Sequence, residues 1–489
     1  MERKEIMSVL GGLEPAGVFH YFEEVCNIPH GSGDTKAISD YCVAFAKKHQ
    51  LTYKQDEYNN VIIWKEGTAG YEQSASVMIQ GHLDMVCEKD PDCDIDFRKE
   101  GIRIQLEDGI ISAKGTTLGG DDGIAVAFAL AILASEEIPH PPLEVVFTVD
   151  EEIGMLGASA MDCSPLKSRI LLNLDSEEEG YLLVSCAGGV TAKAELPVVY
   201  EDKSGTSMEI IISGLKGGHS GTEIDKGRGN ACQLMGRALY RIRKSIPFSL
   251  CRIEGGLKDN AIPREARAVI LVPKGECGEM ETMVKELTKE LQYEFRITDP
   301  DVVVFCEKCD FPNTQAMTGV STSDVIAALV NLPGGIQRMS FEIENLVQTS
   351  LNLGIMKTEG QQVSFSFSVR SSVETEKRAL VDQITCLMEQ LGGTVTCSGE
   401  YPAWEYCPDS SLRNLMVEIY EEQYGEKPVI QALHAGVECG IFTSKLPGLD
   451  CVSFGPDMKD IHTPKESMDV ASVKRTWEYT LEILKRLPQ

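Results

Sequence analysis

The sequence has no long uninterrupted hydrophobic run. Its longest apolar stretch, residues 124–134, is shorter than the roughly 18–20 residues that a membrane-spanning helix requires. We therefore expect a buried helix at this position and no transmembrane segment. The first 26 residues also lack the apolar stretch of a secretory signal peptide, so we expect a cytoplasmic protein.

Basic residues are scarce relative to acidic ones. The 489-residue chain has 46 Lys and Arg against 75 Asp and Glu, which gives a net charge of −29. Such a chain repels phosphate backbones and anionic lipid headgroups. We therefore expect neither nucleic acids nor membranes as partners.

Paired cysteine motifs are nearly absent as well. Among 16 cysteines, only Cys306 and Cys309 form a C-x-x-C pair, and the second pair that a zinc ribbon requires is missing. Cysteines scattered through so long a chain do not resemble a disulfide framework, and they fit a reducing cytoplasm.

The sequence does have the length and the 43% hydrophobic content for two domains. In the first 190 residues, strand-like segments alternate with helix-like ones, which predicts an α/β layer structure. The strand-like segments are residues 57–64, 74–81, 142–150 and 169–175. In such sheets, ligands bind beyond the carboxyl ends of the strands.

The part of the chain from residue 191 to 396 has a different pattern. Strand pairs separated by longer helical segments predict an α+β sandwich, and residues 251–272 and 351–369 each indicate strand, turn, strand. This weak internal repeat suggests a doubled domain. Because the α/β pattern returns after about residue 400, we predict a domain of residues 1–190 and 397–489 with residues 191–396 inserted.

The segment GHLDMV, residues 81–86, ends a strand-like run with a histidine and an aspartate. His82 and Asp84 share one face of an extended chain, because side chains alternate along a strand. Burying a carboxylate is costly unless it is paired or bound to a metal. We expect Asp84 to accept a hydrogen bond from the second ring nitrogen of His82 and so to fix its tautomer.

Further polar residues follow predicted strands or begin the buried helix: Asp121 in TTLGGDDG, Glu151 and Glu152 in DEEIG, Asp175 in NLDSEEEG, and His462 in DIHTP. Asp121 alone is equally well explained as a helix cap. Two histidines and three carboxylates together are a ligand set for two borderline metal ions. One carboxylate can bridge two such ions, and Asp121 follows two glycines that allow a close approach. Of the adjacent Glu151 and Glu152, one can bind metal while the other takes a proton from water.

Nine motifs occur in a fixed order along nearly the whole chain: HLDMV, KGTTLGGDDGIA, EEIGMLGA, NLDSEEEG, GLKGGHSG, DNAIPREA, SVRSS, HAGVECG and GPDMKDIHTP. With them the sequence resembles the zinc-dependent dinuclear metallopeptidase family of aminoacylases, carboxypeptidases and dipeptidases. Within that family it is most similar to the aminoacyl-histidine dipeptidases, a cytosolic bacterial branch. The resemblance implies an α/β catalytic domain of the zinc-peptidase, phosphorylase/hydrolase-like type with an inserted lid domain.

The resemblance also implies two Zn²⁺ ions per chain, with Mn²⁺ or Co²⁺ as alternatives. One ion would be held by His82, Asp121 and Asp175, and the other by Asp121, Glu152 and His462. Glu151 matches the family's general base, and Asp84 matches the aspartate behind the first histidine. The bond between Asp121 and Asp122 is expected to be cis, and Asp122 stands where this branch usually has a neutral residue.

Four residues match positions at which relatives contact substrate: His219, Asn260, Arg370 and His434. His219 would polarise the scissile carbonyl and stabilise the oxyanion, and Arg370 would clamp the carboxylate of a dipeptide. From residue type alone, His219 could instead stabilise its glycine-rich loop, and Arg370 could be a surface residue. Whether His219 acts in its own chain or across a homodimer is left open.

The sequence thus predicts metal-dependent hydrolysis of unblocked dipeptides with broad specificity, including X-His dipeptides. A metal-bridging hydroxide would attack, with Glu151 as general base. An N-acyl amino acid deacylase or carboxypeptidase on the same scaffold is the alternative. A non-catalytic metal-binding scaffold is a third hypothesis, but every role of a working site is filled.

Overall fold

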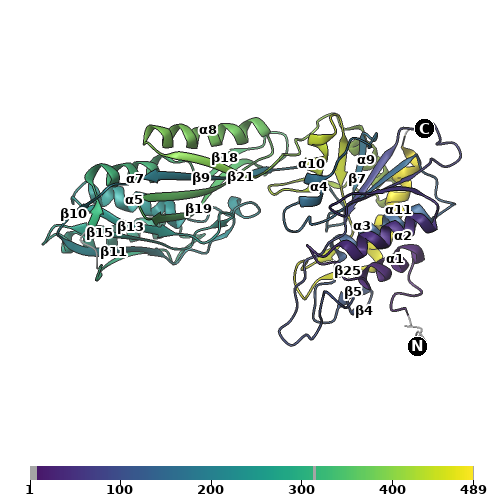
Figure 1. Ribbon diagram of the computed structural model, residues 1–489, viewed down its shortest axis with the longest axis horizontal. Helices are drawn as coiled ribbons and strands as arrows, with labels where there is room; N and C mark the ends of the chain where they lie inside the picture. Colours follow the sequence, from purple (N-terminus) through teal and green to yellow (C-terminus); the bar gives the residue numbers. More distant parts are fainter. Residues whose placement is uncertain (1–7, 312–314, 488–489) are drawn as a thin grey trace. The chain divides into compact units, whose positions relative to one another are not determined.

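The computed structural model describes residues 8–311 and 315–487, which form two compact units (Figure 1). The first unit consists of the described residues up to Ser185, from Tyr406 to Ala432, and from Val437 onward. The second unit takes those of Cys186–Glu405 and Leu433–Gly436, so it is inserted into the first. No helix in the described ranges is long and apolar enough to cross a membrane.

The first unit is built on a mixed sheet with the strand order β1-β2-β6-β3-β7-β23-β8-β22. The strands are β1 (Thr52–Gln55), β2 (Val61–Lys65), β3 (Val77–His82), β6 (Leu143–Thr148), β7 (Ile170–Asn173), β8 (Tyr181–Cys186), β22 (Val429–Leu433) and β23 (Asp450–Ser453). β3 runs parallel to β6 and β7, and β7 runs parallel to β23. The four predicted strand segments are confirmed as β2, β3, β6 and β7.

The helices of this unit are α1 (Ala16–Cys26), α2 (Lys36–Lys48), α3 (Gly120–Ala134), α4 (Leu156–Ala160), α9 (Ser411–Tyr424), α10 (Glu438–Lys445) and α11 (Val470–Arg486). α1 packs on α3 and α3 on β3, while α9 and α10 pack on β23. The predicted buried helix is confirmed as α3, which is apolar on all sides and buried from Asp122 to Leu133. It lies close to β3 at Gly81, where a Cβ atom would lie 2.6 Å from the Ala125 Cβ, so only glycine fits there.

A smaller sheet of the same unit has the order β24-β25-β5-β4. Its strands are β4 (Ile104–Glu107), β5 (Ile110–Ala113), β24 (Met458–Lys459) and β25 (Ser467–Asp469). This sheet pairs the chain near residue 110 with the segment that follows His462, and so helps to fix the position of that segment.

The inserted unit is built on an antiparallel sheet with the order β16-β11-β15-β13-β19-β20-β9-β21, and β18 pairs with β19. Its strands are β9 (Gly188–Pro197), β11 (Thr206–Ser213), β13 (Ser249–Gly255), β15 (Ala266–Val272), β16 (Val303–Lys308), β18 (Gly335–Met339), β19 (Val347–Glu359), β20 (Gln362–Ser371) and β21 (Thr394–Tyr401). Short pairs join β10 (Tyr200–Asp202) to β17 (Gln315–Met317) and β12 (Gly218–His219) to β14 (Ala261–Ile262).

The helices of the inserted unit are α5 (Ala231–Arg243), η1 (Ile224–Lys226), α6 (Cys277–Glu294), α7 (Gly319–Asn331) and α8 (Glu374–Gln390). Figure 1 shows α5, α7 and α8 running along the sheet. An apolar core joins α5, α6, α7 and α8 to the sheet, with Phe365, Phe367 and Leu239 fully buried in it. The other side of strands such as β9 is partly exposed, as the alternating burial along that strand shows.

The order of elements shows that this sheet is doubled. The four strands of the run β11-α5-β13-β15-α6-β16 lie in the sheet in the order β16-β11-β15-β13. The fourth strand of the run is thus followed in the sheet by the first, the third and the second. The run β9-α7-β19-β20-α8-β21, into which the first run is inserted, has the same order. The two second strands, β13 and β19, pair antiparallel and join the halves. The repeat predicted from residues 251–272 and 351–369 corresponds to the second and third strands of each half.

Candidate metal centre

Three neighbouring parallel strands of the first unit lead into side chains that can bind a metal. β3 ends on His82, β6 is followed by residues 150–152, and β7 is followed by Asp175. Because β3 runs parallel to both neighbours, the three ends lie at one edge of the sheet. α3 contributes Asp121, whose bond to Asp122 is cis, as the resemblance implied.

The ligand atoms of five side chains lie within a few ångströms of one another. His82 Nε2 is 3.0 Å from Asp121 Oδ1 and 3.8 Å from Asp175 Oδ1. His462 Nε2 is 3.1 Å from Asp121 Oδ2 and 2.9 Å from Glu152 Oε1. Asp121 therefore presents one oxygen to each imidazole, which is the arrangement required of a bridging carboxylate.

In two groups of three residues, the ligand atoms all lie within 4.8 Å of one another. The first group is His82, Asp121 and Asp175, and the second is Asp121, Glu152 and His462. A third group, His82 with Glu151 and Glu152, meets the same criterion. Imidazole nitrogens and carboxylate oxygens are ligands that zinc and related ions accept. These residues are candidate metal-binding groups, and they fit one or two such ions.

The electrostatics of the cluster require positive charge. Burial raises the pKa of Asp175 well above its ordinary value, and neighbouring carboxylates raise it further. Burial likewise raises the pKa of Glu151 to about 8, and the Glu438 and Glu152 carboxylates add to the increase. Carboxyl groups held this close bind either protons or a cation. A divalent ion would favour the charged form of every one of them.

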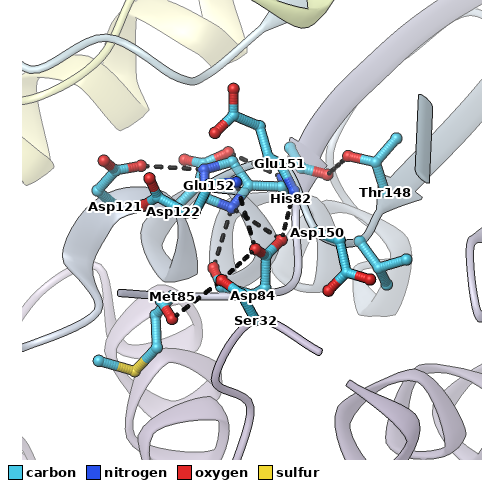
Figure 2. Close-up of polar contacts among 12 residues, drawn as sticks. Ser32, His82, Asp84, Met85, Asp121, Asp122, Thr148, Asp150, Glu151 and Glu152 are labelled. Atoms are coloured by element: carbon cyan, nitrogen blue, oxygen red, sulfur yellow. Dashed lines mark hydrogen bonds and ion pairs between the residues drawn. The ribbon is translucent and has the colours of Figure 1, made fainter. Parts of the chain in front are cut away.

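Asp84 organises the loop that carries Glu151 and Glu152, and Figure 2 shows its carboxylate amid these contacts. It accepts hydrogen bonds from Ser32 Oγ at 2.8 Å, from the Glu151 backbone N–H at 3.0 Å and from the Glu152 N–H at 3.4 Å. His82 Nδ1 lies 2.9 Å from the carbonyl oxygen of Asp84 and 3.6 Å from its carboxylate. The nearest partner of His82 Nδ1 is therefore the backbone of Asp84, and this contact leaves Nε2 to face Asp121.

A buried glutamate, Glu466, holds the loop that precedes Asp121. Its two carboxylate oxygens accept backbone N–H groups from Leu118 at 2.8 Å, Gly119 at 3.2 Å and Gly120 at 2.8 Å. Gly119 has a φ of 72°, a left-handed conformation that suits glycine. Glu466 thereby fixes the start of α3 and the direction of the Asp121 side chain.

The inserted unit contains a separate polar cluster around Arg370. Arg370 is 8% exposed, donates to the Tyr401 hydroxyl at 2.7 Å and has no partner for its Nε among the described residues. Ser350 Oγ and His434 Nε2 are 2.7 Å apart. Burial and the Arg370 charge lower the pKa of His434 to about 3 and also lower that of His219. The cluster therefore carries one fixed positive charge beside two neutral imidazoles.

The tautomer of His219 follows from its contacts. Its Nδ1 accepts hydrogen bonds from the backbone N–H groups of Thr222 at 3.1 Å and Gly221 at 3.3 Å. The proton must then lie on Nε2, which is available as a donor. Asn260 lies next to this loop, because its carbonyl accepts the Ser220 N–H at 2.9 Å. His219 therefore stabilises its own loop and presents a donor at the same time.

The structure brings His82, Asp121, Glu151, Glu152, Asp175 and His462 together in the first unit, with Asp84 beside them. It brings His219, Asn260, Arg370 and His434 into the inserted unit. Sequence reasoning missed Glu466 and Glu438, two fully or nearly fully buried glutamates. Glu438 lies in the recognised motif HAGVECG, and Glu466 lies two residues after the motif GPDMKDIHTP, but only a histidine was selected from each of these segments.

The comparison with protein families agrees with this site. The model of the peptidase family M20/M25/M40 matches residues 78–486. The chain belongs to this family, and it is a metallopeptidase.

Two relatives resemble it over the whole chain. It is 35% identical over 485 residues to the cytosol non-specific dipeptidase of Escherichia coli (strain K12), an alignment that covers 99% of this chain and 100% of that protein. The crystal structure of aminoacylhistidine dipeptidase from Vibrio alginolyticus superposes with a TM-score of 0.93 at 36% identity and covers 99% of each chain. Aminopeptidase PepT from Bacillus cereus, at 16% identity and a TM-score of 0.57 over 98% of this chain, shares the fold.

Proposed function

We propose that the protein hydrolyses unblocked dipeptides of broad side-chain specificity, X-His dipeptides included, at a two-metal centre. The observation that carries the proposal is the pair of ligand groups that share Asp121, each completed by one histidine and one further carboxylate. The similarity over the full chain to two dipeptidases supports the choice of substrate.

The two ions would be held by His82, Asp121 and Asp175 and by Asp121, Glu152 and His462. When bound, they supply Lewis acidity for the scissile carbonyl and lower the pKa of a coordinated water. We take zinc as the first candidate because imidazole and carboxylate ligands suit it, with manganese and cobalt as alternatives.

Glu151 is proposed as the general base. No hydrogen bond holds its side chain among the described contacts, while its backbone N–H is fixed by Asp84 at 3.0 Å. The loop is therefore anchored and the carboxylate is left to accept a proton from the attacking water. Glu151 then passes that proton to the leaving amine, as general acid–base catalysis requires.

The cluster around Arg370 is proposed to bind the substrate. The Arg370 guanidinium would pair with the free carboxylate of the dipeptide. The Nε2–H of His219 would donate to the carbonyl oxygen as negative charge develops on it. Neutral His434 would contribute a hydrogen bond without repelling the substrate's ammonium group, and Asn260 would contact the substrate from the adjacent loop.

The cellular site is proposed to be the cytosol. Cys87, Cys386, Cys397 and Cys407 are exposed free thiols. Exposed free thiols in such number fit a reducing compartment.

A comparison of substrates tests the proposal. The zinc-loaded protein should cleave unblocked dipeptides, X-His among them, and should leave N-acetylated amino acids largely intact. Cleavage of N-acyl amino acids alone would indicate a deacylase. Release of the last residue from longer peptides at a similar kcat/KM would indicate a carboxypeptidase.

A further inference from the structure

A layer of polar side chains lies buried in the central sheet of the first unit. Gln80 on β3, Thr148 on β6 and Asn173 on β7 are all 0% exposed. In the strand register, Gln80 pairs with Asn173 and His82 with Thr148. Register partners in a parallel sheet point to the same face, so the three side chains and His82 share one face.

One buried glutamate from α10 joins this layer. Glu438, also 0% exposed, accepts hydrogen bonds from Gln80 Nε2 and Thr148 Oγ1, each at 2.6 Å. Gln80 Oε1 in turn accepts from Asn173 Nδ2 at 2.6 Å. The three central strands are thus tied to one another and to α10 through side chains.

In each of the three strands, the residue of this layer comes shortly before a candidate metal ligand or the loop that carries one. Gln80 is two residues before His82, and Asn173 is two residues before Asp175. Thr148 is the last residue of β6 and immediately precedes the loop that carries Glu151. A change in strand position at this layer must therefore move the ligands and the proposed base.

The opposite end of α10 holds the other side of that loop. Lys445 Nζ donates to the carbonyl oxygens of Ala158 at 2.7 Å, Ser159 at 2.6 Å and Met161 at 2.9 Å. These residues lie at the end of α4 and just after it. Residues 149–155 therefore run between two segments that α10 fastens, one through Glu438 and one through Lys445.

The layer is costly for the fold. Polar groups buried in a sheet cost free energy wherever they are not hydrogen-bonded, and apolar side chains of equal size would stabilise the sheet as well or better. One Glu438 carboxylate oxygen and the side-chain amide oxygen of Asn173 have no partner among the described residues. Stability alone does not explain such a layer, whereas deviations of this kind are expected where a site must be held in place.

We propose that Glu438 is a positioning residue for the metal centre. By accepting hydrogen bonds from Gln80 and Thr148, it sets the relative positions of His82 and of the loop that carries Glu151 and Glu152. The inference rests on the proposed function in one respect, namely that these side chains bind metal.

The test compares matched substitutions in the full-length protein. Glu438→Met removes both acceptors at nearly constant volume, whereas Glu438→Gln keeps one oxygen for the same two donors. Glu144→Met is the control, because Glu144 is 3% exposed at the opposite end of β6 and accepts backbone N–H groups of Lys167 and Ser168. For each variant we would measure zinc affinity by competition with a chromophoric chelator, kcat and KM for a dipeptide, and the unfolding temperature of the metal-free protein.

We expect Glu438→Met to lower zinc affinity or kcat by about 10–100-fold, the usual effect of losing a group that orients metal ligands, with KM little changed. Glu438→Gln should restore both to within a few-fold of wild type. Glu144→Met should lower the unfolding temperature and leave zinc affinity and kcat unchanged. Thr148→Val removes only one of the two donors to Glu438 and should also lower zinc affinity. It replaces Glu438→Met in the test if that variant does not fold.

Wild-type zinc affinity and kcat in both Glu438→Met and Thr148→Val would overturn the inference. Equal losses of zinc affinity in Glu438→Met and Glu144→Met would also overturn it, because they would indicate a general loss of stability. A wild-type protein that binds no zinc would contradict the proposed function instead, so the two failures are distinguishable.

Discussion

At the scale of single residues, Asp121 determines the character of the site. Its two oxygens face two different imidazoles, at 3.0 Å from His82 and 3.1 Å from His462. A carboxylate that only capped a helix would bond to the backbone N–H groups of its own first turn. The structure shows no side-chain cap at the start of α3, so the cap hypothesis for Asp121 has no support in these contacts.

Glu151→Gln should separate metal binding from proton transfer. The substitution keeps the size of the side chain but removes the base, so kcat should fall by about 10²–10⁴-fold. KM and the bound zinc should change little, because Glu151 belongs to neither ligand group that contains Asp121. Steady-state kinetics with metal analysis checks this, with Glu178→Gln as an exposed control. Retention of more than a tenth of kcat would rule out Glu151 as the base.

His434 predicts a pH-dependent term in stability. The pKa of an unfolded histidine is about 6.5, and the folded value is about 3. The folded state therefore binds fewer protons between these values, so the contribution of His434 is complete above about pH 6.5 and is lost as the pH falls toward 3. When the pH falls from about 7 to 4.5, the unfolding free energy of the wild type should decrease by about 1–3 kcal/mol more than that of His434→Gln. The reason is that one pKa unit is worth a little over 1 kcal/mol.

Urea denaturation at the two pH values measures this difference. His20→Gln is the control, because His20 is exposed and lies outside the inserted unit. If the unfolding free energies of His434→Gln and wild type changed equally with pH, His434 would be protonated as readily in the folded state as in the unfolded state. Its burial would then have no energetic consequence.

At the scale of elements, parallel strands and helix starts converge on the site. β3, β6 and β7 place ligands or a ligand-bearing loop at one edge of the sheet. α3 adds Asp121, and the backbone N–H groups at the start of that helix are held by Glu466 rather than by Asp121. The metal centre therefore depends on side chains that are distant from it in sequence.

Glu466→Gln should weaken the start of α3. The glutamine amide cannot accept hydrogen bonds through its nitrogen, so at least one of the N–H groups of Leu118, Gly119 and Gly120 loses its acceptor. A buried unpaired donor costs about 1–3 kcal/mol. Chemical denaturation should show this loss together with weaker zinc binding, and Glu478→Gln on α11 serves as an exposed control. A Glu466→Gln protein with the stability and zinc affinity of wild type would contradict the role given to Glu466.

Local patterns predicted the elements well, but not the supports of the site. The strands that end at His82 and before Asp175 show continuous apolar runs, and these runs indicate buried parallel strands without any tertiary information. His82, Asp121, Glu152 and Asp175 could be selected because each ends or follows such a strand or follows a glycine pair, whereas His462 came from the segment DIHTP. Glu438 and Glu466 could not be selected in this way, because their partners Gln80 and Leu118 lie about 350 residues earlier in the chain. No local pattern connects them.

At the scale of the whole molecule, the two units have separate cores. The apolar cluster of the inserted unit runs from Val190 to Met388, and the proposed metal ligands all lie in the first unit. The doubled sheet gives the inserted unit two halves joined by β13 and β19. This pairing satisfies, within one chain, a strand edge that would otherwise be open to another strand.

Calorimetry of the full-length protein should therefore resolve two unfolding transitions. The residues proposed to bind zinc all lie in the first unit. Saturating zinc should therefore raise the free energy of unfolding of that unit by about 3 kcal/mol at a hundredfold excess over Kd, and with it the temperature of one transition. The other transition should stay in place. Phe367→Leu, in the core of the inserted unit, should lower only the zinc-insensitive transition. A single transition that zinc and Phe367→Leu both shift would show that the units unfold together.

The most direct test of the account is the metal content of the active protein. Elemental analysis of purified protein, combined with a dipeptide assay before and after chelation, should give two divalent ions per chain. Activity should be lost with the ions and return when zinc is added, and His462→Ala should bind fewer ions than wild type. A fully active protein that carries no divalent ion and is insensitive to chelators would contradict the account.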